Sequence, residues 1–471
     1  MNQNVILEFV STLNRDYIGP SLAFILICTG IFFTVRLGFV PRHYRSAWKL
    51  LLGEKTSRGK ASAKEGMTPV QALSTAIASQ VGTGNIVGVA MALLMGGPGA
   101  LFWLWVSAIC GMSTNFAEAT LGQTYKHVNA DGHMVGGPAY YIRYGMHNKW
   151  LAIVFSVFFI MALGMIGVMV QANSISDAVS TFLPGGGNKL YIGLALTALV
   201  GTVLAGGVTS IASFAERVVP FMAGLFIIGS LVFVGMHYNH LLGTFADVFR
   251  YAFTPKAGAG GIAGYSVMSA VRYGISRGLF SNEAGLGSTP HAHAIAKVNN
   301  PYEQGLFAMI GLSVNILICT LTGLVVLMSG ILEASPDMVG IKMAQSAFCT
   351  EFGDVGKYFI AIAVFFFALT TIIGWYFFAA QNVRFIFGER LIWPYRIVVM
   401  ILVVIASMTK VELVWELADT FNFFIVVPNV IALIWLSPKV AKEVGKMRRH
   451  IATHQLGTKE SSTPPLPEPN S

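Results

Sequence analysis

The most restrictive feature of this sequence is a glycine-rich interruption inside a long apolar segment. Residues 69–95 are long enough to cross a bilayer of roughly 30 Å as one helix. The stretch Val81-Gly-Thr-Gly-Asn-Ile-Val-Gly88 lies in the middle of this segment, and each glycine costs about 1 kcal/mol relative to Ala in a helix interior. Unwound backbone within the hydrocarbon region occurs only where it is buried in protein or lines a cavity. Because interrupted helices of this kind bind substrates and coupling ions, the sequence predicts a transport site here.

The composition places the rest of the chain in the same environment. Of the 471 residues, 54% are hydrophobic and 11% are charged, whereas soluble domains carry about 25% charged residues. We therefore predict an all-α, polytopic membrane protein, embedded in the lipid bilayer, with about eleven transmembrane helices. The segments expected to span the membrane are residues 18–37, 68–95, 98–124, 150–173, 190–210, 216–236, 262–282, 302–332, 356–383, 392–408 and 412–436.

The distribution of basic residues predicts the orientation of these segments. Lysines and arginines are concentrated on one set of connections, after the first, third, fifth, seventh and ninth segments, and in residues 437–471. Positive residues collect on the cytoplasmic side. We therefore expect a multi-pass protein of the cytoplasmic (inner) membrane, with the N-terminus outside and the C-terminus in the cytoplasm. The net charge of +9 then reflects topology, and no nucleic-acid partner is expected. The proline-rich end from Ser461 is expected to be a disordered tail.

The segments also divide into two groups of opposite orientation. Residues 1–67 hold the first segment and a basic loop, and ten segments remain, five in residues 68–236 and five in residues 262–436. Each group opens with a glycine-rich helix, and the second contains Gly278-Leu-Phe-Ser-Asn-Glu-Ala-Gly-Leu-Gly287. Inverted repeats with interrupted helices at matching positions are typical of secondary transporters. The alternative is that these glycines only permit close helix packing.

Four residues of the first interruption are candidate ligands. The N–H groups around Thr83, Gly84 and Asn85 are suited to a substrate carboxylate, and the Thr83 hydroxyl and free carbonyls are suited to a small cation. We expect Gly84 to adopt φ values that other residues disfavour. Gln80 offers a neutral donor and acceptor, or an interhelical hydrogen bond.

The ninth segment adds three candidates. Thr370 and Thr371 offer hydroxyl ligands for an ion, although either hydroxyl is also able to bond to its own helix. Trp375 shares a helix face with Thr371 and lies too deep for an interfacial belt, so it fits either a wall around a small side chain or ordinary packing. At the end of the fourth segment, Gln171 and Asn173 either line the entry path or mark a helix terminus.

Several charged or titratable residues lie within or beside the spans, where charges are expensive and usually paired. Arg277 with Glu283, or Arg272 with another acid, would form a cytoplasmic gate or a structural pair. Glu118 in the third segment also needs a partner. We expect His291 and His293 at a helix end or in a loop, and we do not expect metal binding because no further Cys or His lies at ligand spacing.

Four motifs together resemble one known family, the alanine-or-glycine:cation symporters. These motifs are Val81-Gly-Thr-Gly-Asn-Ile-Val-Gly-Val-Ala90, Gly136-Gly-Pro-Ala-Tyr-Tyr141, Arg277-Gly-Leu-Phe-Ser-Asn-Glu-Ala-Gly-Leu-Gly-Ser288 and Thr370-Thr-Ile-Ile-Gly-Trp375. The resemblance implies a LeuT-type fold of five-plus-five inverted repeats with one extra N-terminal helix. It implies sodium-driven uptake of small neutral amino acids, usually alanine or glycine, and places Gln80, Thr83, Gly84, Thr371 and Trp375 in the pocket region. Members of this family differ at the Gln80 position and some prefer glutamine.

We therefore expect a sodium:alanine/glycine symporter that works by alternating access, with Na⁺ as coupling ion and no other cofactor. Na⁺ would lie between carbonyls of residues 81–85 and the hydroxyls of Thr370 or Thr371, with Thr83 beside it. One alternative is a proton-coupled permease, disfavoured because the first interrupted helix holds no carboxylate. A less favoured alternative is an intramembrane hydrolase using His291, His293 and Glu283, whose spacing lacks the H-E-x-x-H pattern. We thus do not expect an enzyme.

Overall fold

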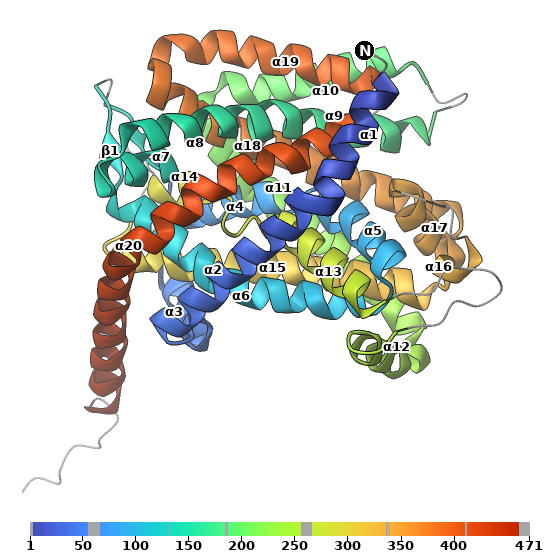
Figure 1. Cartoon of the computed structure of the whole chain (residues 1–471), viewed down its shortest axis with the longest axis horizontal. Coiled ribbons are helices and arrows are strands. Elements are labelled where there is room, and N and C mark those ends of the chain that lie inside the picture. The colour runs from blue at the N-terminus through green and yellow to red at the C-terminus, as the bar shows by residue number, and fades with distance from the viewer. Residues whose placement is uncertain are drawn as a thin grey trace, which may run out of the picture.

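The computed structural model describes residues 3–54, 66–130, 132–183, 187–255, 266–335, 338, 340–409 and 412–460. Nearly all of its regular structure is helical, apart from the small antiparallel hairpin of β1 (His127–Val128) and β2 (Met134–Val135) (Figure 1). The helices up to residue 251 are α1 (Gln3–Leu13), η1 (Asn14–Ile18), α2 (Gly19–Leu37), η2 (Val40–His43), α3 (Tyr44–Glu54), α4 (Pro69–Gln80), η3 (Thr83–Asn85), α5 (Val87–Gly96), α6 (Gly99–Thr124), α7 (Pro138–Tyr140), η4 (Tyr141–Gly145), α8 (Lys149–Met161), η5 (Ala162–Gly167), α9 (Val168–Ser180), α10 (Lys189–Ala205), α11 (Gly207–Met236) and α12 (Tyr238–Tyr251).

The second part of the chain is helical in the same way. Its helices are α13 (Val267–Asn282), α14 (Pro290–Ala294), α15 (Pro301–Met328), α16 (Ile331–Ala334), α17 (Ile341–Phe352), α18 (Asp354–Phe387), η7 (Glu389–Leu391), α19 (Ile392–Met408) and α20 (Glu412–Glu460).

The first interrupted helix has the form that its glycines predict. α4 begins at a capping box, in which the Thr68 hydroxyl accepts from the Gln71 N–H and the Gln71 side chain accepts from the Thr68 N–H. The helix ends at Gln80, and the chain resumes as a short 3₁₀ turn and then as α5, bent by 60° from α4. Residues 81–85 are all buried, as an unwound segment at membrane depth must be.

The second interruption starts later than its glycines suggest. α13 continues through Gly278, where an added Cβ would lie 2.2 Å from the Ser107 hydroxyl, so this glycine serves close packing on α6. The helix ends at Asn282, and its C-cap residue Glu283 adopts a left-handed conformation with φ 53°. Gly285 and Gly287 follow with φ 89° and 75°, values that favour glycine. The chain then re-enters a helix as α14.

The two interrupted helices are joined at one end. Met67 and Ala296 form a parallel β-bridge, in which the Met67 N–H donates to the Ile295 carbonyl at 3.0 Å and the Lys297 N–H donates to the Met67 carbonyl at 3.0 Å. The half-helices α4 and α14 therefore lie side by side in the same half of the molecule.

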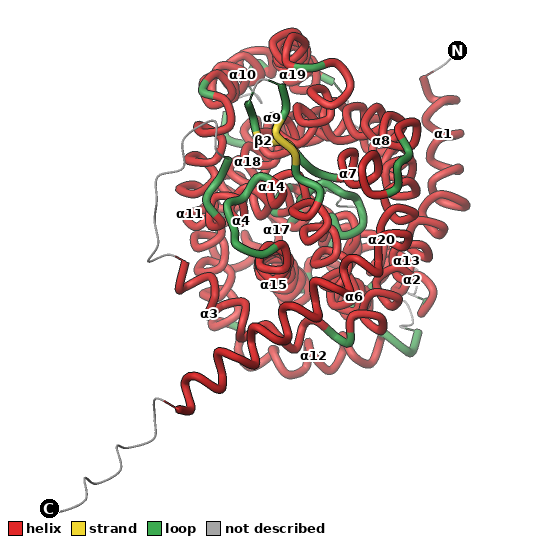
Figure 2. The backbone as a smooth tube through the Cα atoms, turned by 90° about the vertical axis from the view of Figure 1, so that its left-hand side faces the viewer, coloured by secondary structure: helices red, strands yellow, loops and turns green. Residues whose placement is uncertain are grey.

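The remaining contacts relate the two parts of the chain. α10 packs on α19, and α9 packs on α18, so helices of the first part of the chain lie against helices of the second part (Figures 1 and 2). α13 packs on α6, and α4 packs on α15. Each interrupted helix therefore contacts the long helix that follows the other interrupted helix. The N-terminal helix pair α1–α2 lies outside this pattern, against α6, α13 and α20.

The membrane-spanning character is confirmed, but the number of spans is not. Among the described residues, eight helices are long and apolar enough to cross a membrane, and the bent pair α4–α5 raises this number to nine. The expected segments 190–210 and 262–282 appear as the shorter helices α10, with 17 residues, and α13, with 16 residues. Part of the 262–282 segment lies outside the described residues.

The last helix is longer than the expected segment 412–436. α20 is one helix of 49 residues with two internal prolines, and it continues to Glu460. Its last turns project away from the bundle (Figures 1 and 2). The expected disordered end from Ser461 and the basic residues from Lys55 to Lys64 lie outside the described part of the chain.

Candidate functional site

The Thr371 hydroxyl lies at the centre of a group of backbone oxygens. Its Oγ1 is 2.9 Å from the carbonyl of Phe367 on its own helix, 3.1 Å from that of Ala78 and 3.3 Å from that of Val81. A hydroxyl carries a single donor hydrogen, so it is unable to satisfy all of these oxygens. Such an arrangement of carbonyls at the end of a half-helix is suited to a small cation.

Gly82 is needed for this approach. A Cβ built on Gly82 would lie 2.7 Å from the Thr371 hydroxyl, closer than side chains approach one another. The first interruption thus brings α4 against α18 because this position has no side chain.

The two other hydroxyls proposed as ion ligands lie in different surroundings. Thr370 Oγ1 lies 3.0 Å from the Phe367 carbonyl and 3.4 Å from the Met222 sulfur, away from the carbonyls of residues 78 and 81. Thr83 Oγ1 is buried and has no hydrogen-bond partner within the described structure. Of the two adjacent threonines, only Thr371 therefore lies among the backbone carbonyls of residues 78 and 81.

Amide side chains hold the rest of the first interruption. Gln171 Oε1 accepts from the Thr83 N–H at 3.3 Å, so Gln171 lies at the N–H groups expected for a substrate carboxylate. Asn85 Oδ1 accepts from the Gly82 N–H at 3.0 Å, while its Nδ2 donates to Asn315 Oδ1. Asn315 also accepts from the Ser281 hydroxyl at 3.2 Å. Sequence reasoning missed Asn315, although an Asn inside an apolar span is a recognisable signal.

Gln80 and Gly84 face the second interrupted helix. Gln80 Nε2 donates to the Asn282 carbonyl at 2.9 Å, an interhelical hydrogen bond between the two interruptions. An added Cβ on Gly84 would meet the Phe280 ring at 3.3 Å. The expectation of an unusual φ at Gly84 is wrong, because Gly84 lies in a 3₁₀ turn and its φ is not positive.

Glu283 lies at the junction of both interruptions and α18. Its carboxylate accepts from Trp375 Nε1 at 2.7 Å, from the Ser79 hydroxyl at 3.1 Å and from the Ser288 hydroxyl at 2.5 Å. The opposite edge of the Trp375 ring is closed by η5, since a Cβ on Gly167 would lie 2.7 Å from it. Ser79 thus links the Glu283 carboxylate, which also binds the Trp375 indole, to the cluster of backbone carbonyls around Thr371.

The Arg277–Glu283 pair is not formed. Arg277 lies 3.8 Å from Asp419 of α20 instead, and Arg272 donates to the Arg15 carbonyl. Both arginines line a cavity of about 310 Å³ together with Asn14 and Ile18 of the N-terminal helices. Arg272 and Arg277 lie in α13 before the second interruption, whereas the Met67–Ala296 bridge follows α14. A gate in this part of the molecule stays a prediction.

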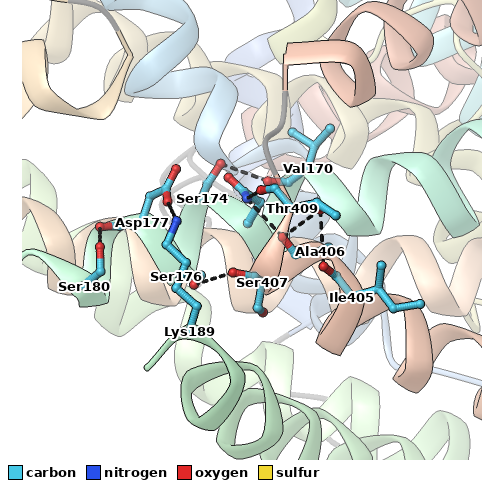
Figure 3. Close-up of polar contacts among 11 residues, drawn as sticks. Val170, Ser174, Ser176, Asp177, Ser180, Lys189, Ile405, Ala406, Ser407 and Thr409 are labelled. Atoms are coloured by element: carbon cyan, nitrogen blue, oxygen red, sulfur yellow. Dashed lines mark hydrogen bonds and ion pairs between the residues drawn. The ribbon is translucent and has the colours of Figure 1, made fainter. Parts of the chain in front are cut away.

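The remaining candidates have separate partners. Asn173 donates to the carbonyls of Ala406 and Thr409 at 3.0 and 2.7 Å. The Ser176 hydroxyl donates to the Ser407 carbonyl at 2.9 Å, so α9 is tied to the end of α19 (Figure 3). His291 contacts the Ser288 carbonyl and Asn382, while His293 contacts Gln304. These two histidines and Glu283 therefore do not form one constellation.

Glu118 is fully buried, and its Oε1 accepts from the Gly287 N–H and the Asn429 amide. Within the described structure, neither Glu118 nor Glu283 forms an ion pair.

Comparison with known proteins extends these findings. The family model described as the sodium:alanine symporter family matches residues 3–461. The chain is 38% identical to the sodium/alanine symporter AgcS of Methanococcus maripaludis, over 93% of this chain and 96% of that protein. It is 37% identical to the probable sodium/glutamine symporter GlnT of Bacillus subtilis, over 92% of this chain and 89% of that protein.

Among solved structures, the chain is similar to a manganese transporter of Eremococcus coleocola in complex with an aromatic bis-isothiourea substituted compound. The TM-score is 0.53 at 14% identity, covering 80% of this chain and 84% of that chain. At this low identity, the likeness concerns the fold alone.

Proposed function

This chain belongs to the sodium:alanine symporter family, and we propose that it takes up a small neutral amino acid, alanine or glycine, together with Na⁺ by alternating access. The observation that carries this proposal is the position of Thr371 Oγ1, 3.1 and 3.3 Å from the carbonyls of Ala78 and Val81. Na⁺ would bind among these oxygens, with the Thr83 hydroxyl as a further ligand.

The amino acid would bind beside this ion, between the two interruptions. Its carboxylate would replace Gln171 at the Thr83 N–H, in the turn that leads into the positive end of α5. Its ammonium group would face Glu283, whose buried carboxylate has only neutral donors around it. Trp375 would close the site over the side chain and so limit its size.

We infer a LeuT-type five-plus-five arrangement from the contacts between the two parts of the chain. Residues 68–236 and 262–436 would form the inverted repeats, with α1 and α2 as the extra N-terminal helix. The pairing of α10 with α19 and of α9 with α18 supports this proposal, because a two-fold axis brings equivalent helices together. The protein would lie in the cytoplasmic membrane with its N-terminus outside. Arg277 and Asp419 would then form a gate on the outer side.

Two alternatives are supported by particular observations. Glutamine as substrate is supported by the 37% identity to the probable sodium/glutamine symporter. Proton coupling is supported by Glu283, since this carboxylate of the second interrupted helix touches Ser79 of the first.

Uptake into proteoliposomes tests the proposal against both alternatives. Labelled alanine, glycine and glutamine are offered under an inward Na⁺ gradient or an inward proton gradient. We expect alanine or glycine uptake that requires Na⁺ and persists when the proton gradient is collapsed. Equal uptake with choline in place of Na⁺ would overturn sodium coupling, and uptake of glutamine alone would overturn the substrate assignment.

A further inference from the structure

The unwound turn of the second interrupted helix is held by a buried carboxylate that the proposed function does not use. Glu118 of α6 accepts through Oε1 from the Gly287 N–H at 2.9 Å and from Asn429 Nδ2 at 2.6 Å. The same Asn429 amide donates to the Gly285 carbonyl at 2.9 Å. Glu118 and Asn429 thus together bind one N–H and one carbonyl of the turn.

The Gly136–Tyr141 motif completes the cradle around this turn. The Tyr141 hydroxyl donates to Asn429 Oδ1 and so fixes which way the amide points. Pro138 lies against Gly287, where an added Cβ would be 2.6 Å from the proline ring. A Cβ added to Gly137 would likewise lie 2.5 Å from the His291 ring. The motif therefore packs along the unwound turn at Gly287 and along the start of α14 at His291.

The turn connects this cradle to the proposed substrate site. Glu283 begins the turn, and the Leu286 N–H donates to the Glu283 carbonyl at 3.2 Å. The Ser288 hydroxyl donates to the Glu283 carboxylate from the other end of the turn. Because residues 283–288 form this closed unit, a shift of Gly287 moves the carboxylate that holds Trp375 and Ser79.

We propose that Glu118 is a positioning residue, which sets the shape of the second interruption and thereby aims Glu283 at Trp375 and Ser79. Its Oε1 does this as a hydrogen-bond acceptor, and its charge carries no coupling ion. The inference rests on the proposed function, since it concerns the same site. The competing role is cation or proton binding at Oε2, which has no hydrogen-bond partner within the described structure.

Substitutions at Glu118 separate the two roles, because Gln keeps the acceptor oxygen and removes the charge. We expect Glu118→Gln to keep alanine transport within about three-fold of the unaltered protein. We expect Glu118→Ala to raise the KM for alanine by roughly ten-fold, the factor associated with one well-formed hydrogen bond. Thermal stability in detergent is measured for each variant, so that KM values are compared between folded proteins. If Glu118→Gln loses transport to the same extent as Glu118→Ala, the charge is essential and the proposal is overturned.

Tyr141→Phe provides a second test should Glu118→Ala fail to fold. It removes only the hydroxyl that orients Asn429, and we expect the KM for alanine to rise several-fold with little change in melting temperature. An unchanged KM in folded Tyr141→Phe, or a lower melting temperature with unchanged KM, would show that the cradle is merely structural. If the unaltered protein transports no amino acid with Na⁺, the proposed function fails instead.

Discussion

At the residue scale, the proposed ion site depends on which side of α18 a hydroxyl occupies. Thr370 and Thr371 are adjacent, and successive helical residues point about 100° apart. Thr371 therefore meets the carbonyls of α4, whereas Thr370 meets the Met222 sulfur. The two residues are a matched pair, with the same side chain on the same helix.

We expect Thr371→Ala to raise the Na⁺ concentration for half-maximal alanine uptake by roughly ten-fold, because one oxygen ligand is lost. Thr370→Ala is the control and should leave the Na⁺ dependence nearly unchanged. Initial uptake rates at varied Na⁺ give both values. Equal effects of the two substitutions would show that Thr371 has no special role.

The glycines of the first interruption form a second matched pair. In Gly82→Ala the added Cβ would lie 2.7 Å from Thr371 Oγ1, whereas in Gly84→Ala it would meet the Phe280 ring at 3.3 Å. We expect Gly82→Ala to lower apparent Na⁺ affinity by roughly ten-fold or more, and Gly84→Ala to have a smaller effect because the ring is able to shift. The same uptake assay measures both, and a larger effect at Gly84 would contradict the assignment.

Trp375 is expected to select substrates by size. Trp375→Leu removes the ring and its bond to Glu283, so larger amino acids such as leucine should compete better relative to alanine. Alanine itself should bind a few-fold more weakly, since one buried methylene contact is worth about 0.8 kcal/mol. Competition by a panel of amino acids measures the change. An unaltered rank order would mean that Trp375 does not face the substrate.

The sequence predicted those parts of the proposed site that depend on short stretches of neighbouring residues. Thr83 and Gly84 lie in an interruption that glycine and apolar length alone reveal. The sequence did not distinguish Thr370 from Thr371, because the choice depends on how α18 is rotated against α4. It also did not reveal the Glu283–Trp375 bond, which joins residues 92 positions apart. Such contacts arise from packing and leave no periodic pattern.

At the scale of helices, the interruptions themselves were predictable, but their junction was not. Both glycine-rich segments do interrupt helices, while Gly278 turned out to be a packing glycine on α6. The β-bridge between Met67 and Ala296 had no sequence signal. It links α4 to α14, so the two half-helices are expected to move together.

Gly66 makes this link possible and provides its test. It has φ 96°, and an added Cβ would lie 2.2 Å from the Ile295 carbonyl. Gly66→Ala should therefore break the bridge and destabilise the fold by about 1–3 kcal/mol. Gly53→Ala in α3 is the control, since an added Cβ there meets nothing within 4 Å. Thermal unfolding in detergent and initial uptake rates compare the two variants, and identical values would refute the link.

At the scale of the whole molecule, composition predicted a polytopic helical protein, and eight helices of the described residues are long and apolar enough to cross a membrane. The span count was less certain, because α10 and α13 have only 17 and 16 residues. Short or interrupted helices at a protein-lined site do not need a full apolar length, so hydropathy alone counts them poorly. The orientation in the membrane remains a prediction from the charges of the connections.

Cysteine labelling tests this orientation. Asn148 and Asn188 are exposed N-cap residues, and the candidate span Lys149–Ser180 lies between them. Asn148 adjoins the basic residues predicted to be cytoplasmic, and Asn188 lies on the predicted outer side.

In a variant without the four native cysteines, Asn188→Cys should react with a membrane-impermeant maleimide on intact cells. Asn148→Cys should react only after permeabilisation, because positive connections stay in the cytoplasm. The two substitutions remove comparable capping bonds, so differences in folding do not explain the contrast. The reverse pattern would invert the proposed direction of the whole bundle and place the Arg277–Asp419 pair on the cytoplasmic side.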